Sequence, residues 1–202
     1  MKKLKVGVLI SGRGSNLQAL LEACATPEFP AEIVLVISNV ADAGGLAYAA
    51  KAGIPSVVLE HQDFESCEAF DAAIDLKLRE AGIEFVCLAG FMRLLSATFM
   101  KIWEGQVMNI HPSLLPAFKG LDVHEQALAA GVRVSGCTVH YVVAELDSGP
   151  IILQAEVPVE PNDTADSLAA RVLKAEHRIY PEALKMIAEN RARLENGDAV
   201  FV

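Results

Sequence analysis

The sequence lacks any long apolar run, so it contains no candidate for a membrane-spanning helix. Basic side chains are comparatively few, with 17 Lys and Arg against 26 Asp and Glu, and the formal net charge is -9. A general nucleic-acid-binding surface is therefore not expected. The four cysteines show no Cys-x-x-Cys spacing. This pattern favours reduced thiols in a reducing compartment over a disulfide framework or a zinc site.

The N-terminus has three lysines, Lys2, Lys3 and Lys5, followed by an apolar run, which superficially resembles a signal peptide. The run covers only residues 6–10 and is interrupted by residues 11–14, so it is too short for a signal sequence. Hydrophobic residues make up 52% and charged residues 21% of the 202-residue chain, a balance typical of one packed globular domain. We expect a single cytoplasmic domain covering residues 1–202.

Short apolar runs alternate with amphipathic segments in the first two thirds of the chain. The runs predict strands at residues 6–10, 33–37, 55–59, 84–89 and 106–110, with helices near residues 17–24, 43–52, 66–78 and 99–103. Apolar strands separated by helices predict an α/β fold with a doubly wound, mostly parallel, Rossmann-like sheet. Ligands of such sheets bind beyond the carboxyl ends of the strands.

The last third of the chain has a different pattern. Residues 134–143 and 151–159 alternate in polarity and predict an antiparallel hairpin. A helix should begin near Thr164 and be kinked or restarted at Pro181. Residues 193–202 predict a small terminal hairpin.

A glycine-rich loop, SGRGSN at residues 11–16, joins the first predicted strand to the first helix. Glycines and a helix N-terminus suit a bound phosphate. The loop lacks the Walker A lysine, Leu17 stands where a third dinucleotide-binding glycine would be, and Ser38-Asn39 replaces the acidic end of the second strand. A monophosphate therefore fits better than a dinucleotide; the alternative is an ordinary turn capped by Ser15 or Asn16.

Asn109 and His111 lie two residues apart at the end of a predicted buried strand, so their side chains share a face. An amide donor beside an imidazole can stabilise an oxyanion and move a proton. A histidine that merely caps a strand end is the competing interpretation. Asp147, in the predicted hairpin loop, would favour the imidazolium form if it reached His111; otherwise it is a solvated turn residue. His140 lies in a predicted strand of alternating polarity, and a histidine in such a place more often has a structural role than a catalytic one.

Four segments, found in this order, resemble one family closely. They are SGxGSN at residues 11–16, LAGFMR at 88–93, NIHPSLLP at 109–116 and LDxGPI at 146–151. Together they resemble the folate-dependent glycinamide ribonucleotide formyltransferases of purine synthesis, and the resemblance runs almost end to end.

The resemblance implies that the amine of glycinamide ribonucleotide attacks the formyl carbon of 10-formyltetrahydrofolate through a tetrahedral oxyanion. It implies no metal and no redox cofactor, and small-molecule substrates as the partners; both a monomer and a homodimer are compatible with it. Residues 1–110 would supply the phosphate side and residues 111–202 the folate side. The implied site residues are the following: catalytic His111, Asn109 and Asp147; phosphate-binding Gly14, Ser15 and Asn16; ribose-binding Glu176; and folate-binding Met92, Arg93, Leu94, Leu95, Asn109, Val143, Ala144, Glu145, Leu146 and Asp147.

The chain departs from this family at Cys67, where many members carry an arginine that reaches the folate tail, and at Asp122, which replaces a histidine. Lys101, Lys119 and Arg93 are the candidates to compensate at the folate tail.

Two other functions are compatible with the pattern. One is a different formyl-folate enzyme, either a hydrolase or the amino-terminal half of a tRNA formyltransferase. The first usually has an extra domain before the catalytic one and the second a basic domain after it, so neither is expected here. The other is a non-catalytic nucleotide- or folate-binding module, which would tolerate loss of His111.

Overall fold

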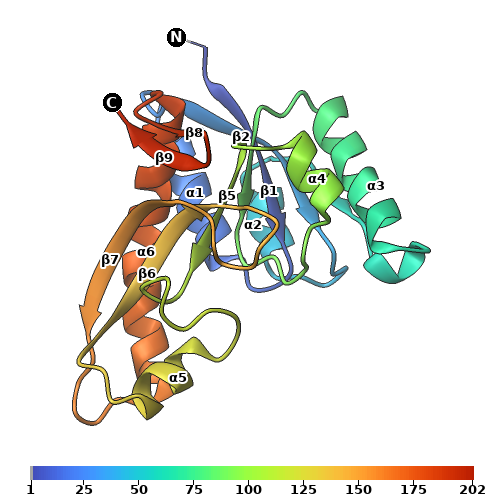
Figure 1. The fold of residues 1–202 in the computed structure, drawn as a ribbon. Coiled ribbons are helices and arrows are strands. Elements are labelled where there is room, and N and C mark those ends of the chain that lie inside the picture. The colour runs from blue at the N-terminus through green and yellow to red at the C-terminus, as the bar shows by residue number, and fades with distance from the viewer. Residues whose placement is uncertain (1) are drawn as a thin grey trace.

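The computed structural model describes residues 2–202; Met1, the first residue of the N-terminal segment discussed above, lies outside the described residues. Seven strands form one sheet in the order β3-β2-β1-β4-β5-β6-β7 (Figure 1). Strands β1 to β5 pair in parallel, whereas β6 is antiparallel to both β5 and β7. The predicted doubly wound, mostly parallel sheet with an antiparallel hairpin in its C-terminal third is confirmed.

The elements follow the predicted order with ends shifted by a few residues. The strands are β1 Leu4–Ile10, β2 Ala31–Ser38, β3 Ser56–Val58, β4 Phe85–Leu88, β5 Val107–His111, β6 Val134–Tyr141 and β7 Ile151–Pro158, with β8 Ala192–Glu195 and β9 Asp198–Phe201 as the terminal hairpin. The helices are α1 Ser15–Cys24, α2 Gly45–Lys51, α3 Cys67–Glu80, α4 Ala97–Ile102, α5 Val123–Ala129 and α6 Ala165–Ala188. Helix α5 and a short 3-10 turn at His61–Asp63 were not predicted.

Two apolar clusters pack against opposite faces of the sheet. One joins α1, α2, α5 and α6 to one face, and the other joins α3 and α4 to the opposite face. Strand β1 contributes to both clusters: Val8 and Ile10 belong to the first and Leu9 to the second. Side chains alternate across a strand, so a continuous apolar run requires cover on both faces. No helix within residues 2–202 is both long and apolar enough to cross a membrane.

Helix α6 is the longest element and runs along one side of the molecule (Figure 1). The side chain of Thr164 caps it by accepting from the Ser167 amide, and the Ser167 side chain accepts from the Thr164 amide in return. The helix does not restart at Pro181, which lies inside it. The buried residues on either side of Pro181 keep α6 packed on the sheet, and this burial outweighs the missing amide.

Tyr180 ties α6 to the sheet, and its replacement by Phe tests this link. Its buried hydroxyl donates to the carbonyl of Leu88 at 2.9 Å and lies 3.4 Å from the carbonyl of Met108. Tyr180→Phe should lower the free energy of unfolding by about 1–3 kcal/mol, since buried carbonyls lose their donor. Urea unfolding measures the change. The matched control is Tyr141→Phe, because the buried Tyr141 hydroxyl has no hydrogen-bond partner within residues 2–202. Equal losses in the two variants would contradict the link.

Candidate active site

The end of β5 carries Asn109 and His111, and β6 lies beside it in an antiparallel register. Asn109 is paired with His140, and His111 with Thr138. Asn109 Nδ2 lies 3.3 Å from His140 Nε2. His111 and His140 are both buried, at 5% and 2% exposure. The register therefore brings into the site a histidine that the sequence interpretation had left out of it.

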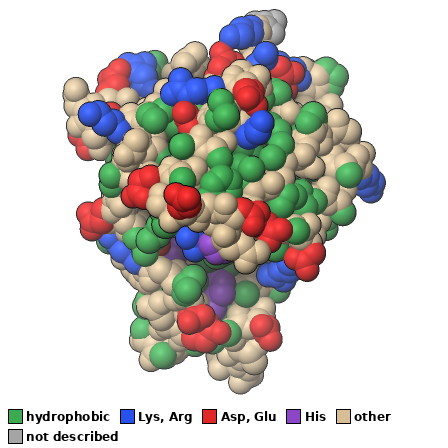
Figure 2. All heavy atoms as spheres, turned by 90° about the vertical axis from the view of Figure 1, so that its right-hand side faces the viewer, with side chains coloured by type: hydrophobic (Ala, Val, Ile, Leu, Met, Phe, Trp, Pro, Cys, Tyr) green, Lys and Arg blue, Asp and Glu red, His purple; other side chains and the backbone are tan. Residues whose placement is uncertain are grey.

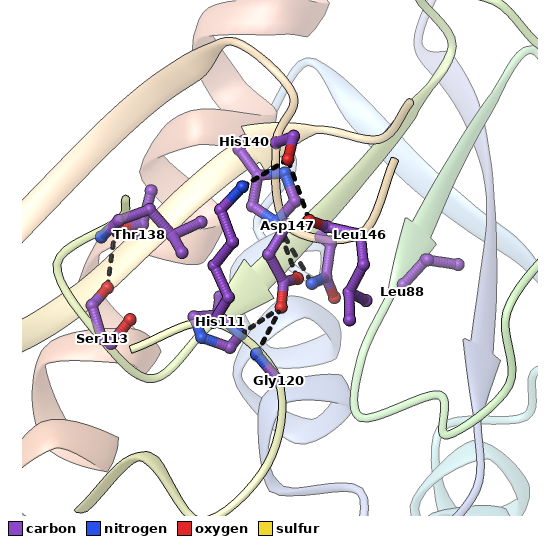
Figure 3. A network of polar contacts seen from close by, with 12 residues as sticks. Leu88, His111, Ser113, Gly120, Thr138, His140, Leu146 and Asp147 are labelled. Carbon is purple, nitrogen blue, oxygen red and sulfur yellow. Dashed lines mark hydrogen bonds and ion pairs between the residues drawn. The ribbon is translucent and has the colours of Figure 1, made fainter. Parts of the chain in front are cut away.

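Asp147 reaches both histidines from the loop between β6 and β7. Its Oδ2 lies 3.4 Å from His111 Nδ1 and accepts a hydrogen bond of 3.0 Å from the Gly120 amide. Its Oδ1 lies 3.8 Å from His140 Nε2. Figure 3 shows the carboxylate pointing between His111 and Gly120. The side chain of Asp147 is only 7% exposed, so it is not a solvated turn residue.

Two main-chain carbonyls determine which nitrogen of each histidine carries a hydrogen. His111 Nε2 lies 2.9 Å from the carbonyl oxygen of Phe118, and His140 Nδ1 lies 2.9 Å from that of Tyr141. A carbonyl oxygen only accepts, so each of these nitrogens is the donor. Neutral His111 then presents an unprotonated Nδ1 to Asp147, and neutral His140 presents an unprotonated Nε2 to Asn109.

His140 stays neutral because burial lowers its pKa, although the carbonyl of Tyr141 and the Asp147 carboxylate act in the opposite direction. Its Nε2 therefore accepts a hydrogen bond from the Asn109 amide group. An amide NH₂ has two hydrogens. The contact occupies one of them and fixes the plane of the amide, and the second hydrogen is left to donate to a substrate oxygen.

The Asp147 loop holds its shape through two backbone features. Asp147 adopts a left-handed φ of 47°, which aspartate tolerates better than bulky residues. A Cβ at Gly149 would lie 1.7 Å from the carbonyl oxygen of Tyr141, so only glycine allows the chain to approach β6 this closely. The close approach at Gly149 is thus a steric constraint that keeps the carboxylate of Asp147 near His111.

The glycine-rich loop begins α1 with Gly14 at the N-cap and without a side-chain cap, so the capping by Ser15 or Asn16 is wrong, whereas the bound phosphate stays a prediction. Gly14 has a left-handed φ of 76° at the N-cap position. A Cβ there would lie 2.3 Å from the Gly45 Cα at the start of α2. Two glycines thus pack backbone against backbone. Gly45 had not been singled out from the sequence, although the Gly44-Gly45 pair was a visible signal.

Asn16 and Glu176 meet although 160 residues separate them. Asn16 Nδ2 donates to Glu176 Oε2 at 2.7 Å. The Asn16 Oδ1 atom is buried and has no hydrogen-bond partner within residues 2–202. Glu176 is 6% exposed, and burial raises its pKa while the Asn16 hydrogen bond acts in the opposite direction. Two residues expected at the substrate phosphate and ribose therefore form one polar pair beside the glycine-rich loop.

The raised pKa of Glu176 makes a pH-dependent contribution to stability. The folded state binds the proton more tightly than the unfolded state, so stability falls as pH rises from the ordinary carboxyl range towards the raised pKa. Glu176→Gln should remove this fall, which urea unfolding at a series of pH values measures. The exposed Glu182 of the same helix provides the control, since Glu182→Gln should follow the parent protein. Identical pH profiles for the parent and Glu176→Gln would contradict the expectation.

The segment expected to contact folate is an exposed apolar wall after β4. Met92 and Leu94 are 67% and 71% exposed, and Leu146 from the Asp147 loop is 49% exposed. The Met92 amide donates to Ser11 Oγ at 2.8 Å, which joins the wall to the glycine-rich loop. Figure 2 shows histidine side chains in a recess of the surface, with hydrophobic and acidic side chains around it.

The three cations considered for the folate tail occupy different places. Arg93 Nη2 lies 3.8 Å from Cys67 Sγ. Lys119 Nζ instead donates to Ser148 Oγ at 2.5 Å, and Lys101 has no side-chain hydrogen bond among the described residues. Of the three cations, Arg93 is thus the one that contacts Cys67, the position singled out in the sequence for the folate tail. Elsewhere in the loop from β6 to β7, residues 143 and 144 are partly or fully exposed, as is Glu145.

Within residues 2–202, no cluster of three or more His, Cys, Asp or Glu side chains is arranged to hold a metal ion. The site instead consists of an amide, two imidazoles and a carboxylate beside an apolar wall. Such a set can stabilise a developing oxyanion and relay a proton.

The sequence profile of the formyl transferase family matches residues 4–184. The chain belongs to this family. Phosphoribosylglycinamide formyltransferase of Escherichia coli is 44% identical over 196 residues, which cover 97% of the chain and 92% of that enzyme. The structure of glycinamide ribonucleotide transformylase 1 from Symbiobacterium toebii superposes with a TM-score of 0.96 at 47% identity, covering 99% of this chain and 94% of that one. The resemblance seen in the sequence is thus confirmed.

A longer protein is also similar to this chain. The trifunctional purine biosynthetic protein adenosine-3 of Bos taurus is 54% identical over 202 residues, all of this chain. The chain spans only 20% of the length of that protein.

Proposed function

We propose that this chain transfers the formyl group of 10-formyltetrahydrofolate to the amine of glycinamide ribonucleotide, as a step of purine synthesis. The observation that carries the proposal is the convergence of Asn109, His111 and Asp147 beside the apolar wall at residues 92–95. The names of the relatives agree with this activity.

The reaction needs a stabilised oxyanion and one proton transfer. As the amine nitrogen bonds to the formyl carbon, the carbonyl oxygen becomes negative, and the second Asn109 N–H donates to it. His111 Nδ1 takes the proton that the amine loses, and the imidazolium formed in this way beside the Asp147 carboxylate adds a positive partner to the oxyanion. The adduct collapses with cleavage of the bond between the formyl carbon and folate N10. The proton lost by the amine passes through His111 and Asp147 to N10, so no net proton is released or consumed.

The two substrates bind on opposite sides of this centre. Gly14, Ser15 and Asn16 hold the phosphate with main-chain amides at the start of α1, and Glu176 accepts from the ribose hydroxyls. On the other side, Met92 to Leu95 and residues 143–147 line the folate pocket, and Arg93 takes the tail carboxylate at Cys67. Residues 1–202 act in this scheme as one domain in which residues 1–110 supply most of the phosphate side and residues 111–202 the hairpin of the folate side, while Met92 to Leu95 and Glu176 cross this division.

The chain acts in this proposal on small molecules alone, with 10-formyltetrahydrofolate as co-substrate and without metal or nucleic acid. The cytoplasm fits four cysteines that are all free thiols.

Incubation with glycinamide ribonucleotide and 10-formyltetrahydrofolate, followed through the folate absorbance, tests the function. We expect a spectral change only when both substrates are present. No change with both would overturn the proposal. A change with the folate alone would indicate the hydrolase instead, and stoichiometric binding of both without a change would indicate a binding module.

A further inference from the structure

The loop that follows β5 contains a buried hydroxyl, that of Ser113, which contacts a hydrogen-bond partner of His111. Ser113 is 1% exposed, and its Oγ lies 2.6 Å from the carbonyl oxygen of Ala117 and 3.1 Å from that of Phe118. The Phe118 carbonyl is the one that accepts from His111 Nε2 at 2.9 Å. One serine hydroxyl therefore contacts the group that decides the tautomer of His111.

The backbone around this carbonyl makes such support necessary. Phe118 has a left-handed φ of 54°, which is unfavourable for a bulky side chain. The loop is also anchored by Thr138, whose hydroxyl donates to the Ser113 carbonyl at 2.7 Å and accepts from the Leu115 amide at 3.0 Å. Figure 3 shows this Ser113–Thr138 contact beside the His111–Asp147 pair. The carbonyl of Phe118 is thus held against His111 by a hydrogen-bonded loop.

From these contacts we propose that Ser113 is a positioning residue that acts through the Phe118 carbonyl to hold neutral His111 as the Nε2–H tautomer. Proton exchange in the reaction then takes place at Nδ1, the nitrogen that faces Asp147 at 3.4 Å. The inference rests on the proposed formyl transfer for its chemistry. The attacking amine loses a proton, His111 Nδ1 accepts it, and folate N10 receives it as the bond to the formyl carbon breaks. The opposite tautomer would place a hydrogen on Nδ1 and block this path.

Nitrogen-15 NMR of histidine-labelled protein tests the proposal independently of turnover. The His111 signals are assigned by their loss in His111→Ala and recorded at a pH where the ring is neutral. We expect the Nε2–H pattern in the parent protein and a mixture of tautomers in Ser113→Ala. In Ser113→Ala, kcat should fall by about 5- to 20-fold with KM nearly unchanged, the size expected for one lost hydrogen bond. Ser113→Thr keeps the hydroxyl and should restore both readouts.

Ser38→Ala is the matched control, because the buried Ser38 hydroxyl also donates to a main-chain carbonyl, that of Val40, at 2.7 Å. It should change stability without changing the His111 tautomer. An Nδ1–H pattern in the parent protein would overturn the proposal, as would unchanged tautomer and kcat in Ser113→Ala. If Ser113→Ala does not fold, the His111 tautomer in the parent protein and the tautomer and kcat of Ser113→Thr test the proposal instead. An Nε2–H pattern in a protein without formyl transfer would refute the proposed function alone.

Discussion

Replacement of His111 with Ala is expected to lower kcat for formyl transfer by roughly 10²–10⁴-fold, the range typical of losing a general acid–base group. The KM for each substrate should stay nearly unchanged. His111 Nδ1 faces the Asp147 carboxylate, and Nε2 donates to the Phe118 carbonyl. The variant loses the nitrogen that exchanges the proton beside Asp147. His140 cannot substitute, since burial lowers its pKa and Asn109 occupies its Nε2. Steady-state kinetics with both substrates measures the effect.

The control for this variant is the same substitution at His61, an exposed residue of the 3-10 turn. His61→Ala should retain full turnover. Thermal unfolding of His111→Ala separates a catalytic loss from a folding defect, because the side chain is buried. Near-normal kcat in folded His111→Ala would refute the catalytic role and favour a binding module.

Replacement of Gly14 with Val is expected to weaken glycinamide ribonucleotide binding by at least roughly 100-fold and folate binding far less. The φ of 76° is unfavourable for a β-branched residue, and the Cβ would lie 2.3 Å from the Gly45 backbone. The loop must therefore move, and with it the amides that we expect to hold the phosphate. A loss of three amide contacts to an anion, at about 1.5 kcal/mol each or more, accounts for such a change. Titration calorimetry with each substrate separately measures it.

Gly12→Val provides the matched control in the same loop. A Cβ at Gly12 meets no atom within 4 Å, so the loop has no steric reason to move. Ribonucleotide binding should therefore suffer much less in Gly12→Val. Equal losses for ribonucleotide and folate in Gly14→Val would indicate misfolding, and equal effects of the two valines would refute a role for the Gly14–Gly45 contact.

Most of the sheet could be predicted because its strands are continuous apolar runs with no other stable location than a covered parallel sheet. Helix α5 was missed because it is seven residues long and buries only Val123 and Ala127, too few for a recognisable period. The predicted restart at Pro181 was also wrong, since the packing of α6 keeps the helix continuous there.

The sequence predicted the candidate site only in part, because local spacing does not reveal which residues lie opposite each other on neighbouring strands. Asn109 and His111 were found because their spacing is local and falls on one strand face. His140 was set aside because alternation along a strand says which face a residue occupies but not which residue lies opposite. Its position opposite Asn109 is a property of the β5–β6 register.

The sequence by itself determined the fold class, the glycine-rich turn before α1 and the amide–imidazole pair at the end of β5, since each depends on periodicity or spacing over a few residues. Only the tertiary structure decided that Asp147 reaches His111 and that Phe118 sets its tautomer. Both contacts require left-handed backbone, at Asp147 and Phe118, in loops brought together by strand pairing. Contacts of that kind join residues that no local pattern relates, so their energies come from packing and hydrogen bonding across the whole fold.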